Sequence, residues 1–186
     1  MIQYPNIDPI ALSVGPVSIY WYGLTYVGGL IFAWWLGRHR AQLAGSPIKV
    51  DQIDDLIFYA ALGIIAGGRI GYALFYGSGS LVDDPLRIVR IWEGGMSFHG
   101  GFLGVVVAMW FLCRNHKIEF GALVDFIAPL APVGLALGRL GNFINQELWG
   151  RPADVPWAMV FPNDPSGLAR HPSQLYQFAM EGMLLF

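Results

Sequence analysis

Residues 53–76 read IDDLIFYAALGIIAGGRIGYALFY, and this stretch decides the fold class. After Asp54 and Asp55 it contains a single charged residue, Arg69. A helix needs about 20 mostly apolar residues to cross a hydrocarbon layer about 30 Å thick. The stretch therefore predicts a membrane-spanning helix.

The composition of the whole chain agrees with this interpretation. The 186 residues are 55% hydrophobic and 13% charged, whereas soluble domains carry about 25% charged residues. The net charge of −2 gives no basic surface, so we expect no nucleic-acid partner. A single cysteine, Cys113, excludes a disulfide framework, and His39 and His116 have no acidic or cysteine partner at ligand spacing, so we expect no metal.

Other apolar stretches extend the pattern to an all-α, polytopic membrane helical bundle that forms one transmembrane domain over residues 1–186. At 1.5 Å per residue the last stretch reaches only about 24 Å, so we expect the sequence to be a piece of a longer protein. The expected full spans are 17–37, 53–76, 96–113 and 120–138, followed by an outward-facing head at 139–170 and an incomplete fifth span at 171–186.

Basic residues indicate the orientation of the bundle. The first connection carries Arg38, Arg40 and Lys49, and the third carries Arg114 and Lys117. Because cytoplasmic loops are enriched in lysine and arginine, these connections are expected inside. The N-terminus and the 139–170 head then face outward.

Polar side chains are costly in a bilayer, so their positions point to function. Those near the outer ends of the expected spans are Tyr20, Tyr22, Arg69, His99, Arg139, Asn142, Asn145, His171, Ser173 and Gln174. Guanidinium groups bind phosphate through paired hydrogen bonds, and a histidine titrates near neutral pH. The residues therefore predict an outward-facing site for an anionic lipid, with acid–base chemistry left open.

Several of these residues have simpler interpretations. Arg69 could reach the interface with its long side chain, and His99 could serve as a hydrogen-bonding residue at a helix start. Asp125 and Glu181 lie deeper and are expected to pair internally. An anion transporter, a lipid-binding protein without catalysis and a structural subunit are the alternative functions.

One run goes further than these physical arguments. Residues 138–152, GRLGNFINQELWGRP, resemble the signature of the prolipoprotein diacylglyceryl transferases of bacterial inner membranes. Five shorter blocks resemble the same family, in the same order along the chain: 21–23, 67–72, 94–101, 125–129 and 170–176.

The resemblance implies an enzyme of lipoprotein maturation. Such an enzyme transfers the diacylglyceryl group of phosphatidylglycerol to the lipobox cysteine of a prolipoprotein and releases glycerol phosphate. It implies a multi-pass protein of the bacterial cytoplasmic (inner) membrane with the site on the periplasmic or outer face, a prolipoprotein signal peptide as partner, and no cofactor. The family continues through two further helices after the fifth.

Site residues follow from the matching motifs. The resemblance implies roles for Tyr22, His99, Arg139, Asn142, Glu147 and Gly150, with Gly94 and Gly100 flanking the histidine. We expect His99 to act on the thiol, as base or as orienter, and Arg139 to clamp the phosphate with support from Asn142 and Glu147. Tyr22 is expected to bind the headgroup, and Arg69 to add positive potential to the substrate site. The sequence allows the catalytic roles of His99 and Arg139 to be exchanged.

Overall fold

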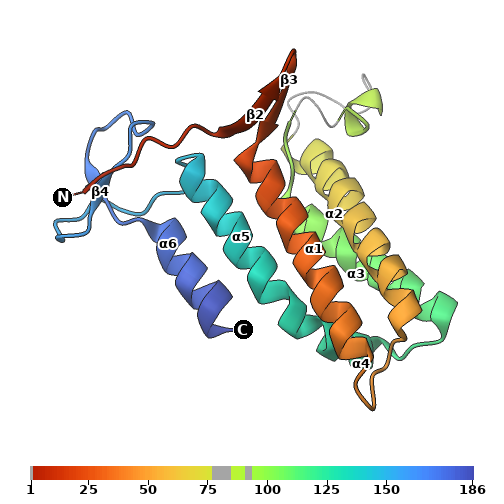
Figure 1. Cartoon of the computed structure of the whole chain (residues 1–186). Helices are drawn as coiled ribbons and strands as arrows, with labels where there is room; N and C mark the ends of the chain where they lie inside the picture. Colours follow the sequence, from red (N-terminus) through yellow and green to blue (C-terminus); the bar gives the residue numbers. More distant parts are fainter. Residues whose placement is uncertain (1, 77–84, 91–93) are drawn as a thin grey trace. The chain divides into compact units, whose positions relative to one another are not determined.

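The computed structural model describes residues 2–76, 85–90 and 94–186. They form two compact units, unit 1 with Met1–Leu36 and Ala128–Phe186 and unit 2 with Gly37–Ile127. The helical elements (Figure 1) are α1 (Trp21–Ala41), η1 (Val50–Gln52), α2 (Ile53–Phe75), η2 (Pro85–Ile88), α3 (Phe98–His116), α4 (Phe120–Ile127), η4 (Ala128–Leu130), α5 (Ala131–Ile144), α6 (Ser173–Gln177) and the π-helix η5 (Phe178–Leu184). The strands are β1 (Ile2–Gln3), β2 (Ile10–Val14), β3 (Val17–Tyr20), β4 (Met159–Val160) and β5 (Ala169–Arg170).

In unit 1, glycines bring α1 close to α5. A Cβ atom added to Gly29 would lie 3.3 Å from the Cα atom of Gly134. Near the start of α1, a Cβ atom added to Gly141 would lie 2.7 Å from Oγ1 of Thr25 and 2.9 Å from Cδ2 of Tyr22. Small residues allow such close helix packing in membranes, and here they set Tyr22 directly against α5.

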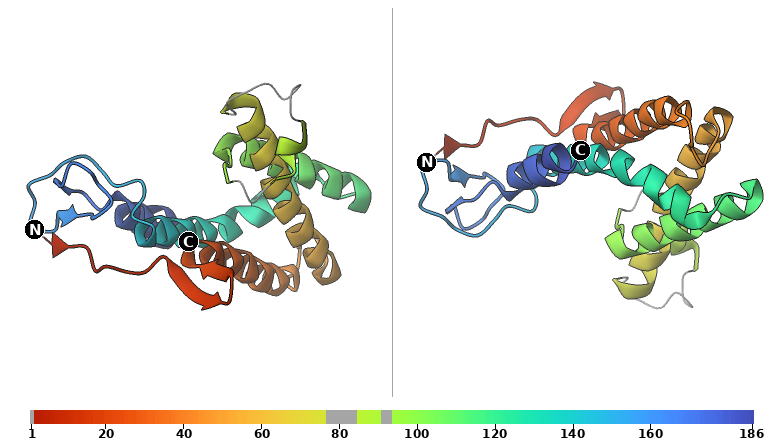
Figure 2. Two further views of the ribbon diagram at one scale, coloured as in Figure 1. Left: turned by 90° about the horizontal axis from the view of Figure 1, so that it is seen from above. Right: turned by 90° about the horizontal axis from the view of Figure 1, so that it is seen from below.

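The last helical elements, α6 and η5, belong to unit 1 and pack against α5. Figures 1 and 2 show α6 and η5 running beside α5. A Cβ atom added to Gly182 would lie only 2.3 Å from the Cβ atom of Ala136, so η5 contacts α5 at a glycine.

A small sheet covers the end of α5. Strand β1 pairs in parallel with β4, and β4 pairs antiparallel with β5. The aromatic core beneath the sheet includes Tyr4, Phe143 and Phe161. The Tyr4 hydroxyl donates to the carbonyl oxygens of Phe143 at 3.1 Å and Ile144 at 3.0 Å, which lie in the last turn of the helix. Burial raises the pKa of this tyrosine.

In unit 2, α2 and α3 are in backbone contact along a glycine stripe. A Cβ atom added to Gly104 would lie 2.1 Å from the carbonyl oxygen of Gly63, and one added to Gly67 would lie 2.3 Å from the carbonyl oxygen of Gly100. The every-fourth-residue glycines of both helices therefore serve close packing.

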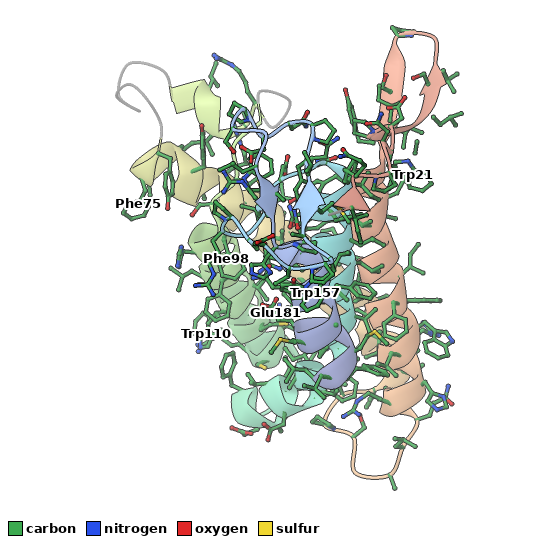
Figure 3. The ribbon with its side chains drawn as sticks, turned by 90° about the vertical axis from the view of Figure 1, so that its left-hand side faces the viewer. Trp21, Phe75, Phe98, Trp110, Trp157 and Glu181 are labelled. Atoms are coloured by element: carbon green, nitrogen blue, oxygen red, sulfur yellow. The ribbon has the colours of Figure 1, made fainter. Side chains whose placement is uncertain are left out.

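Large apolar side chains cover the outside of the helices. Side chains more than half exposed include those of Ile31, Trp35, Phe58, Phe75, Phe98, Phe102 and Leu103. Figure 3 labels Phe75 on α2, and Phe98 and Trp110 on α3. Extensive exposed apolar surface is typical of proteins that contact lipid or partners. Among the described residues, two helical stretches are long and apolar enough to cross a membrane, Val50–Phe75 and Phe120–Ile144.

Helices lie in the four stretches expected to be full spans, but their bounds differ from the expected ones. The chain is mostly helical, as expected, and its short strands were not expected. Residues 17–20, placed in the first span, form β3, because Gly15 takes a φ of +59° at the first position of a two-residue turn with Pro16 and folds β2 onto β3. The fourth stretch reaches Ile144 rather than residue 138, and η4 interrupts it at Pro129.

The glycine contact of unit 2 leads to a stability prediction. We expect Gly104→Ala to lower the free energy of unfolding by about 1–3 kcal/mol, since its methyl group would collide with the α2 backbone. Gly134→Ala is the control, because a Cβ atom there meets nothing within 4 Å. Thermal unfolding in detergent measures both variants, and equal midpoints for them would contradict the prediction.

Candidate functional site

Glu147 is held at the turn that follows α5. The side-chain amide of Asn142 donates to Oε2 of Glu147 at 3.3 Å, and that of Asn145 donates to Oε1 at 3.4 Å. The backbone N–H of Glu147 donates to the carbonyl oxygen of Asn142 at 2.9 Å. The carboxylate and the backbone are thus both fixed to the helix end.

The backbone around Glu147 is strained in a way that functional turns often are. Gln146 and Leu148 adopt φ values of +57° and +55°, which residues with a side chain rarely take. The fully buried side chain of Gln174 donates through Nε2 to the carbonyl oxygen of Glu147. These contacts keep the carboxylate at the end of α5 while the chain reverses direction.

Tyr22 joins this group from the start of α1. Its hydroxyl lies 3.1 Å from that of Tyr26, interacts with the side chain of Asn142 and lies near the carboxylate of Glu147. Three of the predicted site residues, Tyr22, Asn142 and Glu147, are therefore brought together in unit 1. Sequence reasoning missed Gly141, which makes room for Tyr22; a glycine inside a helix, which costs about 1 kcal/mol, was the available signal.

Gly150 lies where two backbone segments nearly touch. Its N–H donates to the carbonyl oxygen of His171 at 2.9 Å, and an added Cβ atom would lie 2.9 Å from both that oxygen and the Cβ atom of His171. A side chain at position 150 would therefore push residues 171–174, the HPSQ segment, away from the turn that contains Glu147.

Arg139 lies one turn before Asn142 on α5, and its guanidinium is bound through its Nε edge. Its Nε lies 3.3 Å from Oε2 of Glu181 on η5, the residue labelled in Figure 3. This confirms the expectation that Glu181 pairs internally. Within the described residues, the two terminal nitrogens of Arg139 have no protein hydrogen-bond partner, and the side chain is partly exposed. The pair of N–H groups that recognises phosphate is thus available.

His99 is the second residue of α3, in unit 2. The helix-start hydrogen bond is made by Ser97, whose Oγ accepts from the N–H of Gly100 at 3.2 Å, and not by His99. The His99 side chain is exposed and its ring contacts that of Phe98, with centroids 5.7 Å apart. In the described part of the chain neither imidazole nitrogen has a hydrogen-bond partner.

Arg69 is buried, with 2% of its surface exposed, so it does not reach for the interface. Its guanidinium donates to the carbonyl oxygens of Ile88, Arg90, Gly94 and Gly95. Gly94 and Gly95 take φ values of +73° and +83°. Arg69 is therefore bound to the backbone of described residues that precede His99.

Metal binding finds no support in the described residues, where no three His, Cys, Asp or Glu side chains gather in a possible metal site. One histidine has an acidic partner that its spacing did not indicate. Nε2 of His116 lies 3.1 Å from Oδ2 of Asp55, and its Nδ1 lies 3.0 Å from Nε2 of Gln52. This group ties the end of α3 to the start of α2.

Comparisons with known proteins identify the family. Residues 9–186 match the family described as prolipoprotein diacylglyceryl transferase. The chain belongs to this family. Proteins named phosphatidylglycerol–prolipoprotein diacylglyceryl transferase are 58% identical in Marinomonas sp. (strain MWYL1) and 54% identical in Ectopseudomonas mendocina (strain ymp). Each match covers all of this chain and 69% or 70% of the relative.

The predicted site residues are divided between the two units. The unit 1 residues are Tyr22, Arg139, Asn142, Glu147 and Gly150, and the unit 2 residues are Arg69, Gly94, His99 and Gly100. Membership in a prolipoprotein diacylglyceryl transferase family agrees with the transferase resemblance of the motifs. The polar residues of each unit cluster around a helix end, at Asn142 to Glu147 and at Ser97 to Gly100.

An ion pair near Gly150 gives a pH prediction. Asp164 accepts from the guanidinium of Arg170 and from Oγ of Ser166 at 2.6 Å, and these contacts, led by Arg170, lower its pKa to about 2. A lowered folded-state pKa contributes stability above the ordinary value of about 3.9 and loses it as the pH falls toward 2. We therefore expect the head to keep this pair at pH 5 and to lose its contribution between about pH 4 and pH 2.

Carbon-13 NMR of labelled aspartate measures this titration. Arg170→Met should raise the pKa of Asp164 toward its ordinary range, and Ser166→Ala should raise it by less, since the arginine is the larger cause. A pKa unchanged by Arg170→Met would contradict the assignment.

Proposed function

We propose that this chain transfers the diacylglyceryl group of phosphatidylglycerol to the cysteine thiol of a prolipoprotein and releases glycerol phosphate. One observation carries the proposal: the whole chain matches proteins of that name at 53–58% identity. The partners are then phosphatidylglycerol and the signal peptide with its lipobox cysteine. No residue arrangement described above favours the anion transporter, the lipid-binding protein without catalysis or the structural subunit.

The reaction sets two chemical requirements. The sulfur atom forms a bond to a glycerol carbon, the bond between that carbon and the phosphate oxygen breaks, and glycerol phosphate leaves with the electron pair. The thiol, with a pKa of about 8.5, must give its proton to a base. The departing phosphate gains negative charge, which a fixed cation stabilises.

His99 suits the first requirement. Its imidazole nitrogens are not engaged by the described residues, and its side chain is exposed at the start of α3. We assign it as the base that accepts the thiol proton. Gly94 and Gly100 support it: Gly100 lets α3 begin against α2, and Gly94 contributes a carbonyl oxygen to Arg69.

Arg139 suits the second requirement. Its Nε atom is held by Glu181, and its two terminal nitrogens are left for paired hydrogen bonds to a phosphate. Tyr22, Asn142 and Glu147 form a second polar group at the same end of α5 and offer donors and acceptors for the glycerol hydroxyls of the headgroup. Gly150 keeps the turn that carries Glu147 against the HPSQ segment.

The membrane arrangement that fits this chemistry is the one expected from the sequence. We propose a single multi-pass transmembrane domain of the bacterial inner membrane with four full spans and part of a fifth, and with its N-terminus outside. The basic residues Arg38, Arg40, Lys49, Arg114 and Lys117 would then be cytoplasmic. The polar residues of the proposed site would face the outer leaflet, where phosphatidylglycerol and signal peptides are both accessible.

Transfer itself is tested with the protein in phosphatidylglycerol vesicles and a synthetic lipobox peptide. We expect glycerol phosphate release that requires the peptide, together with a peptide mass increased by one diacylglyceryl group. Phosphatidylglycerol binding without either product would favour a lipid-binding protein, and anion flux without transfer would favour a transporter.

The role of His99 predicts a pH-dependent loss. His99→Gln should lower kcat by about 10²–10⁴-fold at pH 7, the usual contribution of a general base. The loss should shrink as the pH approaches 8.5, because the thiol then ionises without help. His39→Gln, at the last turn of α1, is the control and should keep the wild-type rate. A His99→Gln enzyme with wild-type kcat would remove this residue from the chemistry.

The role of Arg139 predicts a requirement for its shape. Arg139→Lys keeps the charge but loses the paired N–H groups, so kcat/KM for phosphatidylglycerol should fall about 10–100-fold, as expected for hydrogen bonds worth about 1.5–3 kcal/mol. Arg151→Lys, an exposed arginine of the head, is the matched control. Equal losses for the two variants would contradict the clamp.

A further inference from the structure

Arg69 is a charged residue deep in unit 2 that binds one segment of the chain several times. Nε donates to the carbonyl oxygen of Ile88 at 3.3 Å, Nη2 to that of Arg90 at 2.7 Å, and Nη1 to those of Gly94 and, at 2.9 Å, Gly95. A guanidinium has five N–H donors in a fixed plane. Four hydrogen bonds from this guanidinium go to the carbonyl oxygens of Ile88, Arg90, Gly94 and Gly95. Few of its N–H groups therefore remain to bind a phosphate.

The same part of α2 holds the start of α3 by other contacts. The N–H of Ser97 donates to the carbonyl oxygen of Gly68 at 2.9 Å. A Cβ atom added to Gly95 would lie 2.3 Å from the ring of Tyr72, and one added to Gly71 would lie 2.7 Å from the Cα atom of Gly100. The α2 residues from 67 to 72 thus form a seat for the segment from 94 to 100.

His99 lies inside that seated segment. Ser97 is the N-cap of α3, and His99 is two residues further along the chain. The helix start therefore fixes where the imidazole is presented, and the helix start is itself fixed by Arg69, Gly68 and the glycine contacts. A positively charged anchor is well suited here, since buried carbonyl oxygens need a donor and an unpaired buried charge is costly.

We propose that Arg69 is a positioning residue for the transfer reaction: it holds the carbonyl oxygens of Ile88, Arg90, Gly94 and Gly95 and so places His99. This inference rests on the proposed function. It replaces direct phosphate binding by Arg69 with an effect that acts through the backbone before α3.

Two variants disturb the segment by different means. Arg69→Lys replaces a planar donor set with a single ammonium group that cannot reach all four carbonyl oxygens. Gly95→Ala leaves Arg69 untouched but strains a residue at φ +83° and drives a methyl group into Tyr72. Both should lower kcat by about 100-fold, the cost of misplacing a reacting group by about 1 Å, and leave the Kd for phosphatidylglycerol unchanged. Arg114→Lys is the matched control, because this exposed arginine lies in the last turn of α3, at the opposite end of the helix from His99.

The experiment measures kcat with a lipobox peptide, the Kd for phosphatidylglycerol in detergent, and hydrogen exchange of the backbone amides. Faster exchange at residues 94–101 in Arg69→Lys and Gly95→Ala, with α5 exchanging as in wild type, shows that the segment loosens while the rest stays folded. Unchanged exchange there in Arg69→Lys would overturn the proposal, as would wild-type kcat in Gly95→Ala. A Kd raised tenfold in Arg69→Lys alone would assign Arg69 to the phosphate instead.

Failure of the proposed function gives a different result. If the wild-type protein transfers no diacylglyceryl group to the peptide, that result contradicts the proposed function but not the role of Arg69. The exchange measurement still decides whether Arg69 holds the segment that carries His99.

Discussion

A polar group below the membrane surface must find its hydrogen-bond partners within the protein, because hydrocarbon offers none. In each unit, polar side chains near a helix end are hydrogen-bonded within the protein. In unit 1 the Glu147 carboxylate is bound by the amides of Asn142 and Asn145. In unit 2 the Arg69 guanidinium is bound by backbone carbonyl oxygens. The imidazole of His99 and the terminal nitrogens of Arg139 have no hydrogen-bond partner among the residues that the structure describes, and they carry the proposed chemistry.

Glycine makes these arrangements possible. Gly67 and Gly100 bring the α2 and α3 backbones together, so that one helix can supply acceptors and donors to the start of the next. Gly141 does the same for Tyr22 beside α5. The glycine spacing that indicates helix packing in the sequence is thus also what positions the polar groups.

Much of the architecture could be predicted because the bilayer imposes a simple rule. Long apolar stretches had to be helices, and α2 lies within one residue of the expected 53–76. The short strands could not be predicted this way. Strand β3 is as apolar as the helix that directly follows it, and the turn at Gly15 and Pro16 lies before the strand, so apolar character alone does not show where the strand ends and the helix begins. Strands β1 and β4 are two residues long and pair across most of the chain, which no local pattern reveals.

The candidate site, like the fold, could be predicted only in part. The cost of polar groups in the membrane drew attention to a wider set of outer polar residues, and the family motifs then selected Tyr22, His99, Arg139 and Asn142 among them. Their partners were not predictable, because the contacts between Arg139 and Glu181, or between Arg69 and Gly95, depend on how distant helices and loops meet. Arg69 illustrates the limit: its position suggested a ligand contact, and only the three-dimensional contacts revealed how many of its donors are already used.

We propose that the hydrophilic ends of separate helices lie at the outer membrane surface. Nitroxide labels at single cysteines test it directly, in a Cys113→Ala background that leaves no other thiol. Labels at Trp21 and Phe98, at the starts of α1 and α3, should show shallow immersion and strong relaxation by a paramagnetic ion added outside vesicles of defined orientation. Labels at Trp35 and Trp110, about 21 Å and 18 Å further along their helices, should be protected from that ion. Protection at Trp21 or Phe98, or relaxation only from the inside, would contradict the account.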